Sequence, residues 1–94
     1  KEANIYFDGK VISRTITFVD ASIKTLGVML PGEYEFNTEK KELMEIYTGE
    51  LAVHINDSGI WEKIEGGMSF SVPAKSKFNI KIYKITNYCC SYFE

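Results

Sequence analysis

Glu42 is the residue whose type and position best fit a chemical role in this sequence. It follows a charged stretch, residues 39–41, and precedes an apolar stretch, residues 43–47, that is typical of a buried strand. A buried, unpaired carboxylate is costly or has its pKa raised, so a Glu42 inside the fold needs a partner. Two interpretations stay open: an acid that lines a pocket, or a rim carboxylate paired with Lys40 or Lys41.

A set of aromatic side chains shares the inward direction of the predicted strands. Aromatic rings stack on flat heterocyclic ligands without selecting among them, and buried tyrosine hydroxyls need hydrogen-bond partners. The tyrosines are therefore the better candidates for ligand contact, while the alternative for each ring is plain barrel core. Thr38 shares the inward direction, and its hydroxyl would either bind a ligand or be satisfied within the strand. The aromatic members of the set are Tyr34, Phe36, Phe78, Tyr88 and Tyr92.

Two cations, Lys10 and Arg14, are candidates for holding an anion. Arg14 has the same strand parity as Ile12 and Ile16, so it lies at a rim or points into a pocket. The alternative for both cations is a solvated strand edge.

The sequence offers no set of metal ligands. It has a single histidine, His54, and two adjacent cysteines, Cys89 and Cys90, which do not make a tetrahedral site. Adjacent cysteines are also poorly placed to bridge each other. We expect no cofactor, an outward His54, and a Cys90 that acts as a small buried hydrophobe, since a nucleophilic cysteine would need a base nearby.

Short strands with frequent turns position these residues. Residues 12–18 alternate, with Ile12, Ile16 and Phe18 predicted to face inward. Gly27 interrupts the next strand, which indicates a bulge or a close backbone approach. Turns are expected at residues 8–9, 19–22, 31–32, 48–50, 56–59 and 65–67. This pattern predicts an all-β barrel or sandwich, with one domain over residues 1–94.

Composition narrows the class of protein. The 94 residues carry a net charge of −2 with interleaved signs, which argues against a nucleic-acid or membrane surface. No apolar run is long enough to cross a bilayer, and the first residues lack the apolar core of a signal peptide. The absence of a cysteine framework favours a reducing cytoplasm. A chain this short would gain from homodimerisation, which would cover apolar surface that a small barrel leaves exposed.

The spacing of Pro31 to Leu51 resembles the first motif of the cupins, small proteins built on a double-stranded β-helix or jelly-roll barrel. That motif reads G-x5-H-x-H-x3,4-E-x6-G. Gly32 opens it, and Glu42 precedes Gly49 with six residues between them. Thr38 and Lys40 fall where the two metal-binding histidines would stand.

The second cupin motif, G-x5-P-x-G-x2-H-x3-N, is matched in part. Gly67 and Pro73 are in place, while Lys75 replaces the second glycine and Phe78 takes the histidine position. The resemblance therefore implies the cupin barrel without its usual metal site.

The resemblance is closer to one cupin family, the pyrimidine/purine nucleoside phosphorylases, and it spans nearly the whole chain. The matching segments are N-x-Y-F-x-G-K-V (4–11), G-V-M-x-P-G-E-Y-x-F-x-T (27–38), E-x-M (42–44), G-x-L (49–51), Gly67, F-x-V-P (70–73), S-x-F (76–78) and Y-x-C-x-Y (88–92). The resemblance implies a metal-free cytoplasmic homodimer of broad specificity. Such an enzyme splits purine and pyrimidine nucleosides with inorganic phosphate into free base and pentose 1-phosphate.

This reaction gives each candidate a role. Glu42 would accept hydrogen bonds from ribose hydroxyls or favour the cationic sugar, and Thr38 would bond phosphate or ribose. The aromatic set would stack on the base, and Lys10 and Arg14 would hold phosphate, unless backbone amides at residues 66–67 do so. A cupin that binds a small ligand without catalysis is the alternative, and a structural or sensory cupin is a third interpretation.

Overall fold

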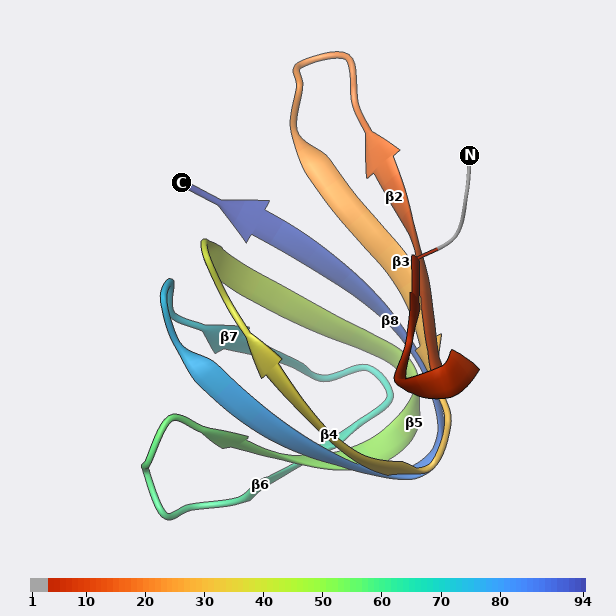
Figure 1. Ribbon diagram of the computed structural model, residues 1–94, viewed down its shortest axis with the longest axis vertical. Helices are drawn as coiled ribbons and strands as arrows, with labels where there is room; N and C mark the ends of the chain where they lie inside the picture. The colour runs from red at the N-terminus through yellow and green to blue at the C-terminus, as the bar shows by residue number, and fades with distance from the viewer. Residues whose placement is uncertain (1–3) are drawn as a thin grey trace.

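Two long antiparallel strands organise the fold. The structure, a computed structural model, describes residues 4–94. Strands β5 (Lys41–Ile55) and β8 (Lys77–Phe93) pair with each other from Lys41 opposite Phe93 to Ile55 opposite Phe78. Figure 1 shows both strands running across the molecule, bending sharply, and returning. Each strand therefore contributes one half to each of two facing layers.

The remaining strands extend these two layers. The first layer contains β1 (Asn4–Tyr6), β2 (Val11–Thr17) and β3 (Ile23–Met29), which pair in that order. Strand β3 also pairs with the second half of β8. On the other side of this layer, β7 (Ser69–Val72) pairs with the first half of β5. In the second layer, β4 (Gly32–Asn37) pairs with the first half of β8, and β6 (Glu62–Glu65) with the second half of β5. A short 3-10 turn, η1 (Phe7–Gly9), joins β1 to β2. The all-β prediction is confirmed.

The hydrophobic core lies between the layers. Alternate residues of each strand point inward, and most of the deeply buried ones are apolar. Three further side chains, Phe36, Ile55 and Tyr92, are partly buried and pack against this core at its open end. The largest fully buried side chains are Met29, Ile46, Leu51, Ile80, Val11, Val53, Val72 and Thr86.

The corner of β5 requires glycine at position 49. The β5–β8 register shifts between residues 46 and 51, so the strand is bulged there. Gly49 has a φ of +122°, and a Cβ at this position would collide with the side chain and Cα of Thr86. Glycine alone permits both this backbone conformation and the close approach.

The structure corrects two expectations about this region. Residues 48–50 were predicted to form a turn between two strands, but they are a bulged corner within one continuous strand. Glu42 was expected in a charged bend and instead is the second residue of β5. A β-bulge and a turn both use glycine and polar residues, so the local sequence does not distinguish them.

The predicted inward face of β2 is also wrong. Val11 and Ser13 are buried, whereas Ile12 and Ile16 are 41% and 36% exposed. The alternation was read correctly, but apolar character did not mark the inner side. Asn4 donates hydrogen bonds to Ser13 and to Thr15 at 3.3 and 3.0 Å, so the polar residues of β2 form a hydrogen-bonded face of their own.

We predict that Gly49→Ala lowers the free energy of unfolding by more than about 2 kcal/mol, because it combines backbone strain with a collision at Thr86. Gly59→Ala is the matched control: Gly59 also has a positive φ, +76°, but nothing lies within 4 Å of an added Cβ, so its cost should be about 1 kcal/mol. Urea unfolding followed by circular dichroism measures both. Equal losses would show that the contact with Thr86 does not matter.

Candidate functional site

Two neighbouring cavities share part of their lining. The inner pocket has a volume of about 230 Å³ and the outer cavity about 650 Å³. The residues that line both, and therefore form the neck between them, are Thr25, Asn37, Glu42 and Tyr92. A volume of this size fits a small organic molecule.

The inner pocket is mostly apolar and aromatic. Phe36 from β4 and Phe78 from β8 stack with their ring centroids 5.4 Å apart, and Met29 and Met44 complete the apolar wall. Phe36 and Phe78 are directly opposed in the β4–β8 register, so the ring pair is fixed by strand pairing. These walls suit a flat ring system.

Tyr88 owes its place in the pocket to Gly27. The two residues are opposite each other on β8 and β3, and a Cβ on Gly27 would lie 2.6 Å from the Cζ atom of Tyr88. The Tyr88 ring therefore lies over the glycine, and its hydroxyl receives a hydrogen bond from Ser13 on β2. Gly27 was predicted to mark a bulge or a close backbone approach; the β3 register is regular there, and a Cβ would meet the Tyr88 ring first and the carbonyl oxygen of Ile12 at 2.8 Å.

Glu42 stands at the neck between the cavities. It is opposite Tyr92 in the β5–β8 register, and the Cys90 thiol donates a hydrogen bond to its Oε1 at 3.4 Å. Burial raises the pKa of Glu42, and the hydrogen bond from Cys90 partly opposes that rise. Glu42 is thus a pocket carboxylate with a partner, and that partner is not Lys40 or Lys41.

The polar groups around Glu42 remain protonated at neutral pH. Burial raises the pKa of Cys90 and of Tyr88 to about 12 each, and it raises the pKa of Tyr92 as well. The Tyr92 hydroxyl and the Thr25 hydroxyl form a hydrogen bond of 3.2 Å. The neck therefore presents neutral donors beside a single carboxylate.

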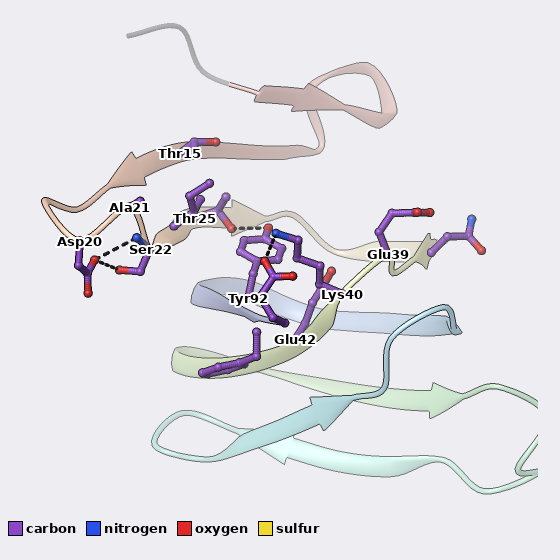
Figure 2. A pocket seen from close by; sticks show the side chains of 13 residues that line it. Thr15, Asp20, Ala21, Ser22, Thr25, Glu39, Lys40, Glu42 and Tyr92 are labelled. Atoms are coloured by element: carbon purple, nitrogen blue, oxygen red, sulfur yellow. Dashed lines mark hydrogen bonds and ion pairs between the residues drawn. The ribbon is translucent and has the colours of Figure 1, made fainter.

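The outer cavity is wider and carries more charge. Figure 2 shows Asp20 and Ser22 at one end, Glu39 at the other, and Glu42 with Tyr92 between them. Lys40 forms an ion pair of 2.7 Å with Glu94. Among residues 4–94, Lys40 is the one cation in the lining of either cavity, against four carboxylates: Asp20, Glu39, Glu42 and Glu94.

Five of the nine predicted site residues meet in the inner pocket: Glu42, Phe36, Phe78, Tyr88 and Tyr92. Their proposed roles stay predictions, but their shared position is now established. The inward direction of Tyr88, Cys90 and Tyr92 along one strand was correctly read from the period-2 pattern.

The other four predicted site residues lie elsewhere. The Thr38 hydroxyl donates to the carbonyl of Pro73 at 2.6 Å and accepts from the amide of Ser76 at 2.9 Å. The Tyr34 hydroxyl donates to the carbonyl of Leu30 at 2.6 Å. Both side chains are buried within the wall, outside the linings of the two cavities.

The two predicted cations are also absent from both linings. Lys10 is exposed and follows η1. Arg14 lies on the outer face of the first layer, where it lines a hollow with Leu26 and Tyr47. It shares that face with Ile12 and Ile16, as the parity predicted, but the face points away from the pocket.

The residues at the cupin metal positions do not fit a metal ion. Thr38 is engaged by backbone groups, Lys40 is a cation in an ion pair, and Phe78 has no donor atom. In the described part of the chain, three or more His, Cys, Asp or Glu side chains nowhere gather as they would around a metal. Only Glu42 of the motif retains a ligand atom.

Sequence reasoning missed Thr25, Asn37 and Ser13 as lining residues. Thr25 and Ser13 share inward positions with Gly27 and Val11 on their strands. Gly27 could have indicated them, because a glycine inside a strand leaves room for a large ring on the facing strand. Thr25 has the same strand direction as Gly27 and therefore lies on the same inner face.

The arrangement defines a class of fold. The chain is similar to an RmlC-like cupin from Shewanella frigidimarina NCIMB 400, with a TM-score of 0.77 at 15% identity, covering 97% of this chain and 81% of that one. The predicted cupin-type barrel is therefore confirmed as the fold.

The family follows from closer relatives. The pyrimidine/purine nucleoside phosphorylase family matches residues 1–92, and the chain belongs to that family. It is 61% identical over 92 residues to a pyrimidine/purine nucleoside phosphorylase from Chlorobium chlorochromatii (strain CaD3), covering 98% of this chain and 88% of the relative. The one from Leptospira interrogans (strain Fiocruz L1-130) is 54% identical over 94 residues, covering 100% and 89%.

A solved structure supports the same placement. A protein of unknown function from Acinetobacter sp. ADP1 has a TM-score of 0.95 at 42% identity, covering 99% of this chain and 90% of that one.

In residues 4–94 no helix is long and apolar enough to span a membrane.

We predict that Gly27→Ala displaces the Tyr88 ring and destabilises the fold by roughly 1–3 kcal/mol, the range for overpacking. The double variant Gly27→Ala/Tyr88→Leu should recover part of this loss relative to Tyr88→Leu alone, because the colliding ring is gone. Thermal unfolding of the four proteins gives the coupling between the two positions. Strictly additive losses would contradict the contact.

Proposed function

We propose that the chain is a nucleoside phosphorylase of broad specificity, which splits purine and pyrimidine nucleosides with inorganic phosphate into free base and pentose 1-phosphate. The names of the relatives support this activity. The observation that carries the proposal is the neck at Glu42, a half-buried carboxylate between an aromatic pocket and an open cavity.

The inner pocket is proposed to take the base. Phe36, Phe78 and Tyr88 offer ring faces, which stack on any base. The lining of this pocket is mostly apolar and aromatic, so few polar groups are available to read base edges. An apolar pocket separates related ligands only weakly, which supports a broad range of bases.

The sugar is proposed to lie at the neck. There Glu42 accepts hydrogen bonds from ribose hydroxyls and, in its ionised form, stabilises the positive charge that develops on the sugar. Thr25, Asn37 and Tyr92 surround the same space with neutral polar groups. Thr38, predicted to bond phosphate or ribose, is proposed to hold the wall beside Pro73 instead.

Phosphate is proposed to enter through the outer cavity. A phosphate oxygen forms a bond to C1′ as the C1′–N bond breaks, and the bonding electrons leave with the base. The base takes one proton, which hydrogenphosphate supplies, so the charges and atoms balance. Lys40 is the nearest candidate to hold the anion and would have to exchange its pairing with Glu94, a replacement for the predicted Lys10 and Arg14.

We further propose that the reaction needs no metal ion and that the enzyme works in the cytoplasm. The first follows from the donor set at the cupin metal positions. The second is supported by the two free, buried thiols of Cys89 and Cys90, which suit a reducing compartment.

One observation favours the alternative, a cupin that binds a small ligand without catalysis. The four carboxylates that line the outer cavity outnumber the single Lys40, and like charges oppose the approach of a phosphate dianion. On this alternative, nucleosides bind in the inner pocket but are not split.

We predict phosphate-dependent release of uracil and adenine from uridine and adenosine, measured by chromatography, with a rate that EDTA leaves unchanged. Glu42→Gln should lower kcat/KM on the order of 100-fold, because the variant loses the charge that faces the sugar. Lys63→Gln is the control, since Lys63 is exposed and pairs with Glu50 and Glu65 on the far layer. Nucleoside binding without base release would favour the alternative. Loss of activity with EDTA that a metal ion restores would refute the metal-free mechanism.

We also propose a homodimer that forms through the outer face of β1, β2 and β3. In a two-fold dimer one patch faces its own copy, and a continuous exposed apolar patch marks such a surface. The neighbouring apolar side chains of this face, each between 36% and 65% exposed, are Ile5, Ile12, Ile16, Leu26 and Val28.

We predict that the protein elutes at twice the chain mass in size-exclusion chromatography with light scattering, and that Val28→Glu shifts it to the monomer. Val28 is opposite Ile12 in the β2–β3 register, and a buried unpaired charge in the patch is costly. Ile60→Glu is the control, because Ile60 is 66% exposed in the loop after β5, away from this face. A dimer that survives Val28→Glu would place the interface elsewhere.

A further inference from the structure

Among residues 4–94, Cys90 is the one group bonded to the Glu42 carboxylate. Its thiol is 3% exposed, lines the inner pocket, and donates to Glu42 Oε1 at 3.4 Å. The position is set by the sheet: Cys90 is opposite Met44, and Glu42 is opposite Tyr92, so Cys90 and Glu42 are diagonal neighbours on the inner face of two paired strands.

The remaining groups near Glu42 are engaged with other partners or carry charge of the same sign. Lys40 is paired with Glu94, and the Tyr92 hydroxyl with Thr25. Asp20, Glu39 and Glu94 are the other carboxylates that line the outer cavity. Tyr6, Tyr88 and Tyr92 line the inner pocket from β1 and β8. Burial favours the neutral form of Glu42, whereas the hydrogen bond donated by Cys90 favours the ionised form.

We propose that Cys90 is a positioning residue for the reaction, and that its thiol holds the Glu42 carboxylate aimed into the neck and in the ionised form. The proposal rests on the proposed function for the role of that carboxylate, but not for the contact itself. Cys90 takes no part as a nucleophile, because the thiolate is the reactive form and burial raises the pKa of this thiol to about 12. The cysteine therefore acts through Glu42.

The direction in which the pH profile shifts follows from the hydrogen bond, in which the Cys90 thiol donates and the Glu42 carboxylate accepts. Activity that needs ionised Glu42 rises with pH through the pKa of that carboxyl. Removing the donor raises this pKa and moves the acidic limb of the pH profile to higher pH, whereas a stronger hydroxyl donor moves it to lower pH. Replacing one hydrogen bond is worth roughly half a pH unit.

The test compares wild type, Cys90→Ala and Cys90→Ser in two measurements. The first is the pH profile of kcat/KM for uridine phosphorolysis. The second is the titration of the ¹³C-labelled Glu42 carboxyl by NMR, assigned through its absence in Glu42→Gln, which needs no activity. We expect the midpoint to move up by roughly half a pH unit in Cys90→Ala and down in Cys90→Ser. Cys89→Ala is the matched control, because Cys89 points away from the pocket, and it should leave both midpoints unchanged.

Equal midpoints in all variants, or shifts of the same sign in both Cys90 variants, would overturn the proposal. If nucleosides are not split, the proposed function fails, while the carboxyl titration still decides whether Cys90 controls Glu42. If Cys90→Ala does not fold, the conservative Cys90→Ser variant decides alone, through the sign of its shift.

Discussion

The continuous pairing of β5 with β8 is the constraint on which the structure depends. These strands pair from the mouth of the barrel to its closed end and beyond the corner. Their first and second halves lie in different layers, so the geometry of the corner sets how far apart the two layers open. The inner pocket lies between the diverging layers, and the four residues of the neck stand on paired strands rather than on loops. A site built on paired strands keeps its side chains in fixed register.

Two glycines make that pairing compatible with a pocket. Gly49 lets β5 turn against Thr86, and Gly27 lets the Tyr88 ring lie across β3. In both cases a missing side chain makes room for a residue on β8, Thr86 in the first case and Tyr88 in the second. The first position shapes the closed end and the second shapes the wall of the inner pocket. The shape of the site therefore depends on the absence of side chains at Gly27 and Gly49 as well as on the side chains that line it.

The sequence predicted most of the strands, the barrel class and five members of the inner pocket, although it divided β5 in two, because period-2 alternation sets the direction of every side chain once a strand is recognised. It failed where direction alone was insufficient. Ile12 and Ile16 looked like core and lie outside, since alternation does not say which face is covered. Thr38 does point inward, but its hydroxyl is satisfied by Pro73 and Ser76, contacts between residues 35 and 38 positions apart. The partner of Glu42 was likewise sought next to it in sequence, at Lys40 and Lys41, and was found 48 positions away at Cys90.

The hydrogen bond between Cys90 and Glu42 distinguishes this barrel from a metal-binding cupin. In the cupin motif Glu42 belongs to a set of ligands, and a cation would keep the carboxylate ionised. Here threonine, lysine and phenylalanine occupy the other positions, and none of them faces Glu42 as a bonded partner. The carboxylate still needs compensation for its burial. A neutral donor from the neighbouring strand supplies only part of it, which leaves the pKa of Glu42 raised. A carboxylate that lines a cavity can accept hydrogen bonds from hydroxyl groups, which is the role that the proposed reaction gives to Glu42.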